Sequence, residues 1–156
     1  MKKIIPQLLV LTVLLFVGQG IKAQTRVEFR DQINQFLKEE GFQPTYDPED
    51  ESLNFKYEGN RFYLMVENDG PYYVELHETG FTSKDTNRAY LLAACNRANN
   101  TKRCGKAYIS SGGSVNFTVE FYVSSIGAFK EVFYSTLRCA NAVKKTTKDF
   151  YNELDD

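Results

Sequence analysis

Strict alternation of apolar and polar positions is the feature that most constrains the fold of this chain. In four segments every second residue is apolar, so each segment presents one apolar face when it is extended. These segments are 53–57, 62–66, 72–76 and 114–124. Turn residues separate the first three, which predicts an antiparallel meander with one face toward a core.

Three segments with the spacing of amphipathic helices surround these strands. The first begins at Thr25, which forms a capping box with Glu28, and ends before Gly41. The second follows the cap residues of segment 82–85 and ends at Asn99-Asn100. The third is a long closing helix whose apolar residues recur near one stripe. Members of this stripe are Phe129, Val132, Phe133, Leu137, Ala140, Val143, Phe150 and Leu154.

The order of these elements predicts an α+β fold, with a single antiparallel sheet of about five strands packed by three helices. One more strand, 106–110, is joined to 114–124 by the turn Ser111-Gly112-Gly113. The sequence leaves open a further short strand at 42–46. The predicted order is therefore α-β-β-β(-β)-α-β-β-α. Residues 24–156 have an ordinary domain size and contain no linker, so we expect one domain.

The N-terminus has the pattern of a secretory signal peptide, residues 1–23. Lys2 and Lys3 form a positive start, an apolar run extends from Ile4 to Val17, and Ala23 stands at the expected cleavage position. The alternative is a membrane-spanning helix, which needs about 20 apolar residues, more than this run provides. We therefore expect cleavage, a periplasmic or secreted protein, and no membrane span after cleavage.

The charge balance argues against a nucleic-acid partner. The chain has 19 Lys and Arg, three of them before Gln24, so 16 remain beside 20 Asp and Glu, a net charge of −4. Affinity for phosphate backbones depends on clustered basic residues, which a mildly acidic domain does not favour. With 12 Phe and 10 Tyr, the chain is also too aromatic for a disordered protein.

Three cysteines, Cys95, Cys104 and Cys139, allow three pairings and leave at least one thiol free. An exported protein can keep a disulfide. Cys95 and Cys104 flank a short polar segment, so we expect a bridge between them, from the end of the second helix to the next strand. The alternative, with equal weight, is three buried thiols that act as small apolar side chains.

The chemically active residues predict no catalytic site. His77 is the single histidine, it lies on the outward face of a predicted strand, and the sequence suggests no Ser-His-Asp or Cys-His arrangement around it. Metal-binding Cys and His spacings are missing, and the acidic run 47–51 lacks the Gly and the distant Glu of a calcium loop. We therefore expect a protein that is not an enzyme and that uses neither a metal nor a cofactor.

The outward faces of the predicted strands carry aromatic and Met side chains among charged residues. If the apolar sets face the helices, five such residues project from the other side of the sheet, within a polar rim that is typical of protein-binding surfaces. They are Tyr63, Met65, Tyr73, Tyr108 and Tyr122. We predict that they bind a partner. The alternative is that the tyrosines only stiffen neighbouring strands by cross-strand pairing.

In the order of its elements, nearly all of segment 25–154 resembles the YbjN-like family, whose members are also called bacterial sensory transduction regulators. The resemblance lies in the helix 87–99, the Asn-rich turn after it, and the strand-turn-strand 106–124 before a long helix. Its local signature is Leu91-Leu92, Asn96, Asn99 and the strand 105–108. The order of elements is also similar to the type III secretion chaperone fold. The resemblance implies a non-enzymatic module that dimerises and binds other proteins.

Two functions of different classes follow. The first is an exported non-enzymatic protein-interaction module, which binds a peptide or protein partner or forms a homodimer, through the sheet face or the long last helix. The second is a small exported enzyme or small-ligand-binding domain with a pocket between sheet and helices. A buried polar cluster favours the second, whereas a wholly apolar interior beneath a flat aromatic face favours the first.

Overall fold

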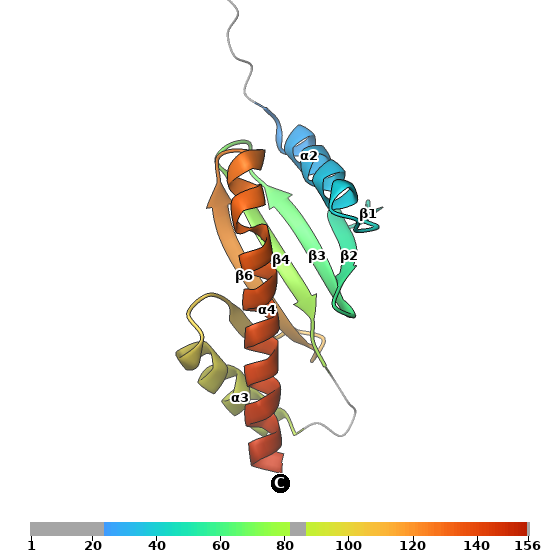
Figure 1. The fold of residues 1–156 in the computed structure, drawn as a ribbon. Coiled ribbons are helices and arrows are strands. Elements are labelled where there is room, and N and C mark those ends of the chain that lie inside the picture. Colours follow the sequence, from blue (N-terminus) through green and yellow to red (C-terminus); the bar gives the residue numbers. More distant parts are fainter. Residues whose placement is uncertain (1–23, 82–86, 156) are drawn as a thin grey trace, which may run out of the picture.

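The computed structural model describes residues 24–81 and 87–155, which form the predicted α+β fold (Figure 1). The helices are α2 (Arg26–Glu39), α3 (Arg88–Thr101) and α4 (Ile126–Asp155). The strands are β1 (Thr45–Asp47), β2 (Ser52–Tyr57), β3 (Asn60–Glu67), β4 (Tyr72–Thr79), β5 (Lys106–Ile109) and β6 (Val115–Val123).

All six strands pair in one antiparallel sheet, in the order β1-β2-β3-β4-β6-β5. The first four follow one another as a meander. The chain then passes through α3 to the outer edge of the sheet, where β5 forms, and a tight turn returns it so that β6 pairs with both β4 and β5. The predicted fold class is confirmed, with one strand more than the expected five.

β1 is the short strand whose formation the sequence did not decide. It begins at Thr45 and not at residue 42, as the segment 42–46 would require. Gly41, with a φ of 86°, ends α2, and the Phe42 N–H donates back into the last turn of that helix at 2.9 Å. Pro44 has no N–H to offer a neighbouring strand. Pairing with β2 therefore starts only at Thr45.

The predicted capping box starts α2. The Thr25 hydroxyl accepts from the Glu28 N–H at 3.3 Å, and the Glu28 carboxylate accepts from the Thr25 N–H at 2.9 Å. The buried face of α2 is the predicted one. Its members are Phe29, Ile33, Phe36 and Leu37.

α3 begins and ends later than the sequence indicated. The predicted cap segment 82–85 lies outside the described residues, and the helix is capped by Asn87, whose side chain accepts from the N–H groups of Ala89 and Tyr90. The helix continues past the Asn99-Asn100 pair to Thr101. This longer helix places Cys95 in its middle.

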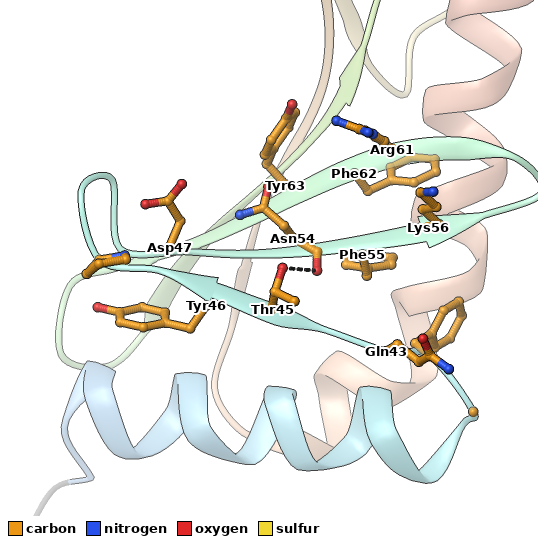
Figure 2. A pocket seen from close by; sticks show the side chains of 13 residues that line it. Gln43, Thr45, Tyr46, Asp47, Asn54, Phe55, Lys56, Arg61, Phe62 and Tyr63 are labelled. Carbon is orange, nitrogen blue, oxygen red and sulfur yellow. Dashed lines mark hydrogen bonds between the residues drawn. The ribbon is translucent and has the colours of Figure 1, made fainter.

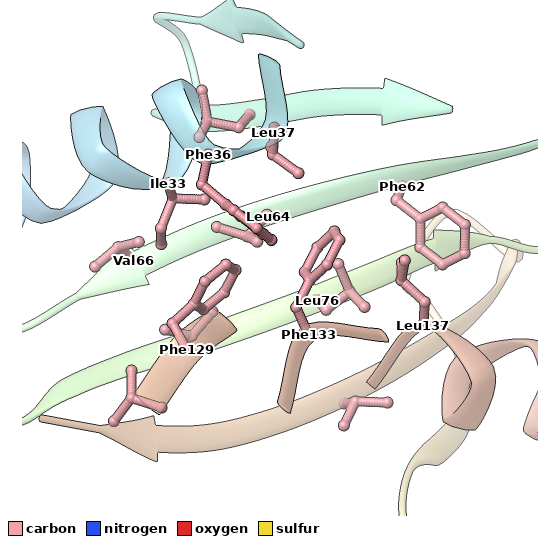
Figure 3. Close-up of a cluster of buried hydrophobic side chains, with 14 of the residues drawn as sticks. Ile33, Phe36, Leu37, Phe62, Leu64, Val66, Leu76, Phe129, Phe133 and Leu137 are labelled. Carbon is pink, nitrogen blue, oxygen red and sulfur yellow. The ribbon is translucent and has the colours of Figure 1, made fainter. Parts of the chain in front are cut away.

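The helices bury the apolar face of the sheet in two clusters, the first of which Figure 3 shows from close by. One cluster lies under α2 and the first half of α4, and the other lies between α3, β5, β6 and the second half of α4. With 30 residues, α4 is about 45 Å long and reaches both. Phe129, Phe133 and Leu137 belong to the first cluster, and Val143 and Tyr151 to the second.

The buried stripe of α4 differs from the predicted one. Val132 and Leu154 are exposed, whereas Thr147 and Tyr151 are buried. The Thr147 hydroxyl donates to the carbonyl one turn earlier at 2.9 Å, and the Tyr151 hydroxyl accepts from the Asn87 N–H at 3.1 Å. These hydrogen bonds let two polar side chains take positions that periodicity alone assigns to apolar residues.

The disulfide joins Cys104 to Cys139, so the expected Cys95–Cys104 bridge is wrong. Cys95 is a free, buried thiol of the second core cluster, and burial raises its pKa. Because α3 continues to Thr101, Cys95 lies about 9 Å along the helix axis from the helix end. Cys104 lies after that end and pairs with α4 instead, with the two Cα atoms 6.0 Å apart, a normal separation for a bridge.

This bridge predicts a specific peptide map and a loss of stability. Non-reducing digestion of the protein purified from its own host should yield a Cys104–Cys139 peptide pair and a free Cys95. Cys104→Ser should lower the free energy of unfolding by about 3–4 kcal/mol, the loop-entropy value for a sequence separation of 35. Cys95→Ala, which breaks no bridge, is the control and should cost clearly less. A Cys95–Cys104 peptide pair would contradict the structure.

Candidate functional site

The face of the sheet opposite the helices, here called the open face, carries all five residues predicted to bind a partner. Along β3 and β4, buried side chains that face the helices alternate with partly exposed ones that face away. In the described part of the chain, the helices lie over the other face (Figure 1). The five residues are Tyr63, Met65, Tyr73, Tyr108 and Tyr122. The predicted strand faces are confirmed, and the binding role stays a prediction.

The structure brings two of the five side chains into contact with each other. Tyr73 and Tyr122 are directly opposite on β4 and β6, with ring centroids 5.1 Å apart. Met65 lies on β3, diagonal to Tyr73, and Tyr63 is two residues before it on the same strand. Tyr108 lies apart on β5, where it pairs with a residue six positions before Tyr122, about 20 Å along β6. Tyr122 is the most accessible of them, with 66% exposure.

Two carboxylates lie at the centre of the open face. Glu75 and Glu120 are directly opposite on β4 and β6, an arrangement that is unfavourable on its own. His77 Nε2 lies 2.7 Å from Glu75 Oε2, and Lys106 Nζ donates to Glu120 Oε2 at 2.5 Å. Thr118 donates to the other Glu120 oxygen at 3.3 Å. Both carboxylates are therefore held by partners on the same face, and His77 has a structural explanation.

These carboxylates also set the protonation of neighbouring groups. Burial, together with a hydrogen bond to Glu120 and the charge of Glu75, raises the pKa of the Tyr73 hydroxyl. The hydrogen bond from Lys106 lowers the pKa of Glu120, although burial opposes it. For Tyr108, burial and then the two carboxylate charges raise the pKa. The Tyr73 and Tyr108 hydroxyls are therefore neutral hydrogen-bond donors at neutral pH.

A polar cluster is buried between the sheet and α4, so the interior is not wholly apolar. Its centre is the fully buried Glu78 of β4. Lys144 Nζ donates to Glu78 Oε1 at 2.7 Å, to Asn60 Oδ1 at 2.9 Å and to the Thr79 carbonyl at 3.1 Å. With its amide nitrogen turned toward Glu78, Asn141 donates to that carboxylate at 3.0 Å.

The bonds of this cluster are internal, so it does not provide an open ligand site. The three hydrogens of the Lys144 ammonium have three acceptors, and no described buried side-chain nitrogen or oxygen lacks a partner. Burial raises the pKa of Glu78, while the hydrogen bond and charge of Lys144 lower it. Such a pair fixes where a helix sits on a sheet.

Two further observations concern metals and membranes. Within residues 24–81 and 87–155, no group of three or more His, Cys, Asp and Glu is arranged to hold a metal ion. Among the described helices, none is both long and apolar enough to cross a membrane.

Asn99 closes one edge of the sheet. Its side-chain amide donates to the Ala107 carbonyl at 3.0 Å and accepts from the Ala107 N–H at 2.7 Å. Ala107 lies on the edge strand β5, and a side chain that binds both of its main-chain groups occupies the position of a further strand. The sequence signature included Asn99, but this role could not be predicted because it depends on the packing of α3 beside β5.

A groove lies at the opposite edge, where β1 separates from β2 (Figure 2). Its volume is about 810 Å³. The segment 41–48 forms one wall, and β2 and β3 form the other, with Asn54, Lys56, Arg61 and Tyr63 among its residues. Tyr63 belongs also to the open face. The sequence gives no signal for this groove, because the groove depends on where β1 begins.

The chain belongs to the YbjN family, described as "Putative bacterial sensory transduction regulator". The family model matches residues 30–156, from the first turn of α2 onward. The resemblance noted in the sequence is therefore confirmed. No curated protein matches the chain.

Among solved structures, one chain of the "Structure of the HopA1-SchA Chaperone-Effector Complex" is similar, with a TM-score of 0.51 and 12% identity. The similarity covers 75% of this chain and 93% of that chain. At this identity the likeness shows the fold alone. It confirms the predicted relation to a secretion-chaperone fold.

The lowered pKa of Glu120 predicts a pH dependence of stability. A carboxyl whose folded pKa lies below its ordinary value of 4.5 stabilises the fold above that value, and this contribution is lost as the pH falls through the folded pKa. The difference in unfolding free energy between the parent and Glu120→Gln should therefore be largest near neutral pH and shrink below about 4.5. Denaturant titrations over this range test it, with Glu67→Gln on the same face as control. A difference that does not change with pH would contradict the assignment.

The buried pair predicts strong coupling between Glu78 and Lys144. Lys144→Met should cost about 3 kcal/mol at neutral pH, because it leaves a buried carboxylate without its cation. Glu78→Leu combined with Lys144→Met should recover most of that loss, since the Asn141 amide can then turn its oxygen to accept from the Asn60 amide at 3.0 Å. Urea denaturation of the single and double variants measures the coupling. Additive losses would mean that the two groups do not act as a pair.

Proposed function

We propose that this protein is an exported, non-enzymatic interaction module that binds a peptide or protein partner on the open face. The observation that carries the proposal is that Tyr63, Met65 and the contacting pair Tyr73 and Tyr122 share a sheet face that the described helices leave uncovered. Aromatic and Met side chains inside a polar rim match the composition of protein-binding surfaces.

The comparisons support this class of function. The family is described as one of regulators, and the similar solved structure is a chaperone bound to its effector, as its title states. Neither description refers to a chemical reaction. The hydrogen-bonded state of His77 and of the Glu78 cluster also accounts for these groups without catalysis.

Export rests on two features of the chain. The pattern of residues 1–23 is that of a secretory signal peptide, with Ala23 at the cleavage position. The Cys104–Cys139 bridge suits the periplasm or the extracellular medium, where disulfides persist. We infer that the mature protein works in one of these two compartments.

A homodimer is the second form that this interaction could take. Tyr122 on the open face and Val132 on α4 are both exposed, and each lies on one of the two surfaces that the sequence suggested for self-association. Sedimentation of the purified mature chain distinguishes a homodimer from a module that binds only another protein. A homodimer forms without any partner and dissociates on dilution.

The proposal predicts that one exposed tyrosine carries much of the binding. Tyr122→Ala should change the free energy of unfolding by less than about 0.5 kcal/mol. It should weaken capture of the partner from the host cell envelope, since truncating an interface aromatic often costs about 2 kcal/mol or more. Tyr73 is unsuitable for this test, because it also holds Glu120.

Tyr90→Ala is the matched control. Tyr90 is 38% exposed and lies on α3, away from the open face. Mass spectrometry should identify the same captured proteins for the parent and the Tyr90 variant, and fewer for the Tyr122 variant. Equal capture by all three proteins would rule out the open face as the binding surface.

A further inference from the structure

The groove between β1 and β2 exposes a stretch of strand edge. β1 pairs with β2 only as far as the Thr45–Asn54 pair, and β2 continues to Tyr57. β2 ends in a two-residue turn formed by Glu58 and Gly59, whose φ angles are 49° and 80°. In a turn of this type the flanking residues, Tyr57 and Asn60, form a hydrogen-bonded pair.

It follows that the main-chain groups of Lys56 point toward the groove. Along an antiparallel strand, the N–H and C=O groups of successive residues point to opposite sides of the strand. Because those of Tyr57 bond to β3, those of Lys56 point away from β3. Among the described residues, the segment 41–44 makes no main-chain hydrogen bond to Lys56. This contrasts with the other edge of the sheet, where Asn99 occupies the corresponding groups of Ala107.

Two cations stand beside this open edge. Lys56 and Arg61 are directly opposite each other on β2 and β3, both are exposed, and both line the groove (Figure 2). In the described part of the chain, neither has a carboxylate within salt-bridge distance. Like charges that face each other across strands repel, so the arrangement gains from an added anion.

The acidic pair on the same face, in contrast, has partners within the chain. Glu75 and Glu120 are also cross-strand neighbours of like charge, but His77 and Lys106 are in contact with them. Asp47 also lines the groove, but among the described residues no carboxylate is within salt-bridge distance of either cation. The charge complementarity of this surface therefore points to an anionic group from outside the described chain at the groove.

We infer that the groove binds an extended segment of the partner with an acidic side chain, which lies between Lys56 and Arg61. This inference rests on the proposed function, because it takes the partner to be a peptide or protein. Arg61 can hold a carboxylate by two parallel hydrogen bonds, and Lys56 adds a third donor. The Lys56 main-chain groups and the amides of Gln43 and Asn54 provide partners for the backbone of the segment.

The groove and the open face form one continuous surface. Tyr63 lines the groove and lies on the same face of the sheet as Tyr73 and Tyr122. A partner chain that leaves the groove can therefore continue across the open face. The acidic residue would fix its register, and the tyrosines would supply apolar contact area.

Two synthetic hexapeptides test this inference on the mature chain. Both alternate Val and Thr, and they differ only at the third residue, which is Glu in one and Lys in the other. In NMR titrations of ¹⁵N-labelled protein, the Glu peptide should shift the Lys56 and Arg61 amide signals saturably. The Lys peptide should bind about ten-fold more weakly, because it lacks the charge-assisted hydrogen bonds.

Charge reversal provides the decisive comparison. Lys56→Glu with Arg61→Glu should invert the preference, so that the Lys peptide binds more tightly. Arg88→Glu with Lys148→Glu changes the same charge on the helices and should leave the preference as in the parent. Thermal melting checks that each variant is folded.

Three results of the peptide titrations would overturn the inference. These are equal shifts with both peptides, shifts confined to residues outside the groove, and shifts of Lys56 that depend on protein concentration without peptide, which would assign the groove to a second copy. The peptide titrations do not involve the partner, so failure of this inference can be distinguished from failure of the proposed function. Loss of partner capture in Tyr122→Ala but not in the charge-reversed variant would support the open face and reject the groove.

Discussion

The packing of α4 along the inner face of the sheet is the interaction on which the rest of the structure depends. This helix contributes to both core clusters, as β6 does, with Phe129, Phe133 and Leu137 in one and Val143 and Tyr151 in the other. Lys144 lies next to Val143 and binds the buried Glu78, so the polar pair fixes where the helix lies, while the apolar residues supply the burial energy. The Cys104–Cys139 bridge adds a covalent link between α4 and the segment before β5.

With α2, α3 and α4 on one side, the other side of the sheet remains uncovered in the described residues. A sheet face of this kind needs polar groups that are compatible with water, and Glu75 and Glu120 meet that need through His77 and Lys106. The same face also carries aromatic residues, which are enriched in protein-binding surfaces. The two edges are unequal, because Asn99 caps β5 whereas the groove beside β2 leaves Lys56 and Arg61 without carboxylate partners in the described chain.

The sequence predicted those features that follow from local periodicity. The alternation in β6, the capping box at Thr25 and the face on which Tyr73 and Tyr122 lie all follow from the order of residues along one element. It failed where the outcome depends on contacts between distant elements. Cys104 pairs with Cys139 of α4 while Cys95 is buried in the second core cluster, and α3 places Asn99 against β5. The contact between Glu78 and Lys144 spans 66 residues and has no signature in either local pattern.

We propose that the open face binds a partner in the periplasm or in the extracellular medium. Site-specific photo-crosslinking in the native host tests it most directly, with benzoylphenylalanine placed at position 122 in one strain and at position 90 in another. The account predicts that illumination gives a discrete adduct from position 122, on the open face, and none from position 90, on α3. An adduct from position 90 with none from position 122, in folded exported protein, would contradict it.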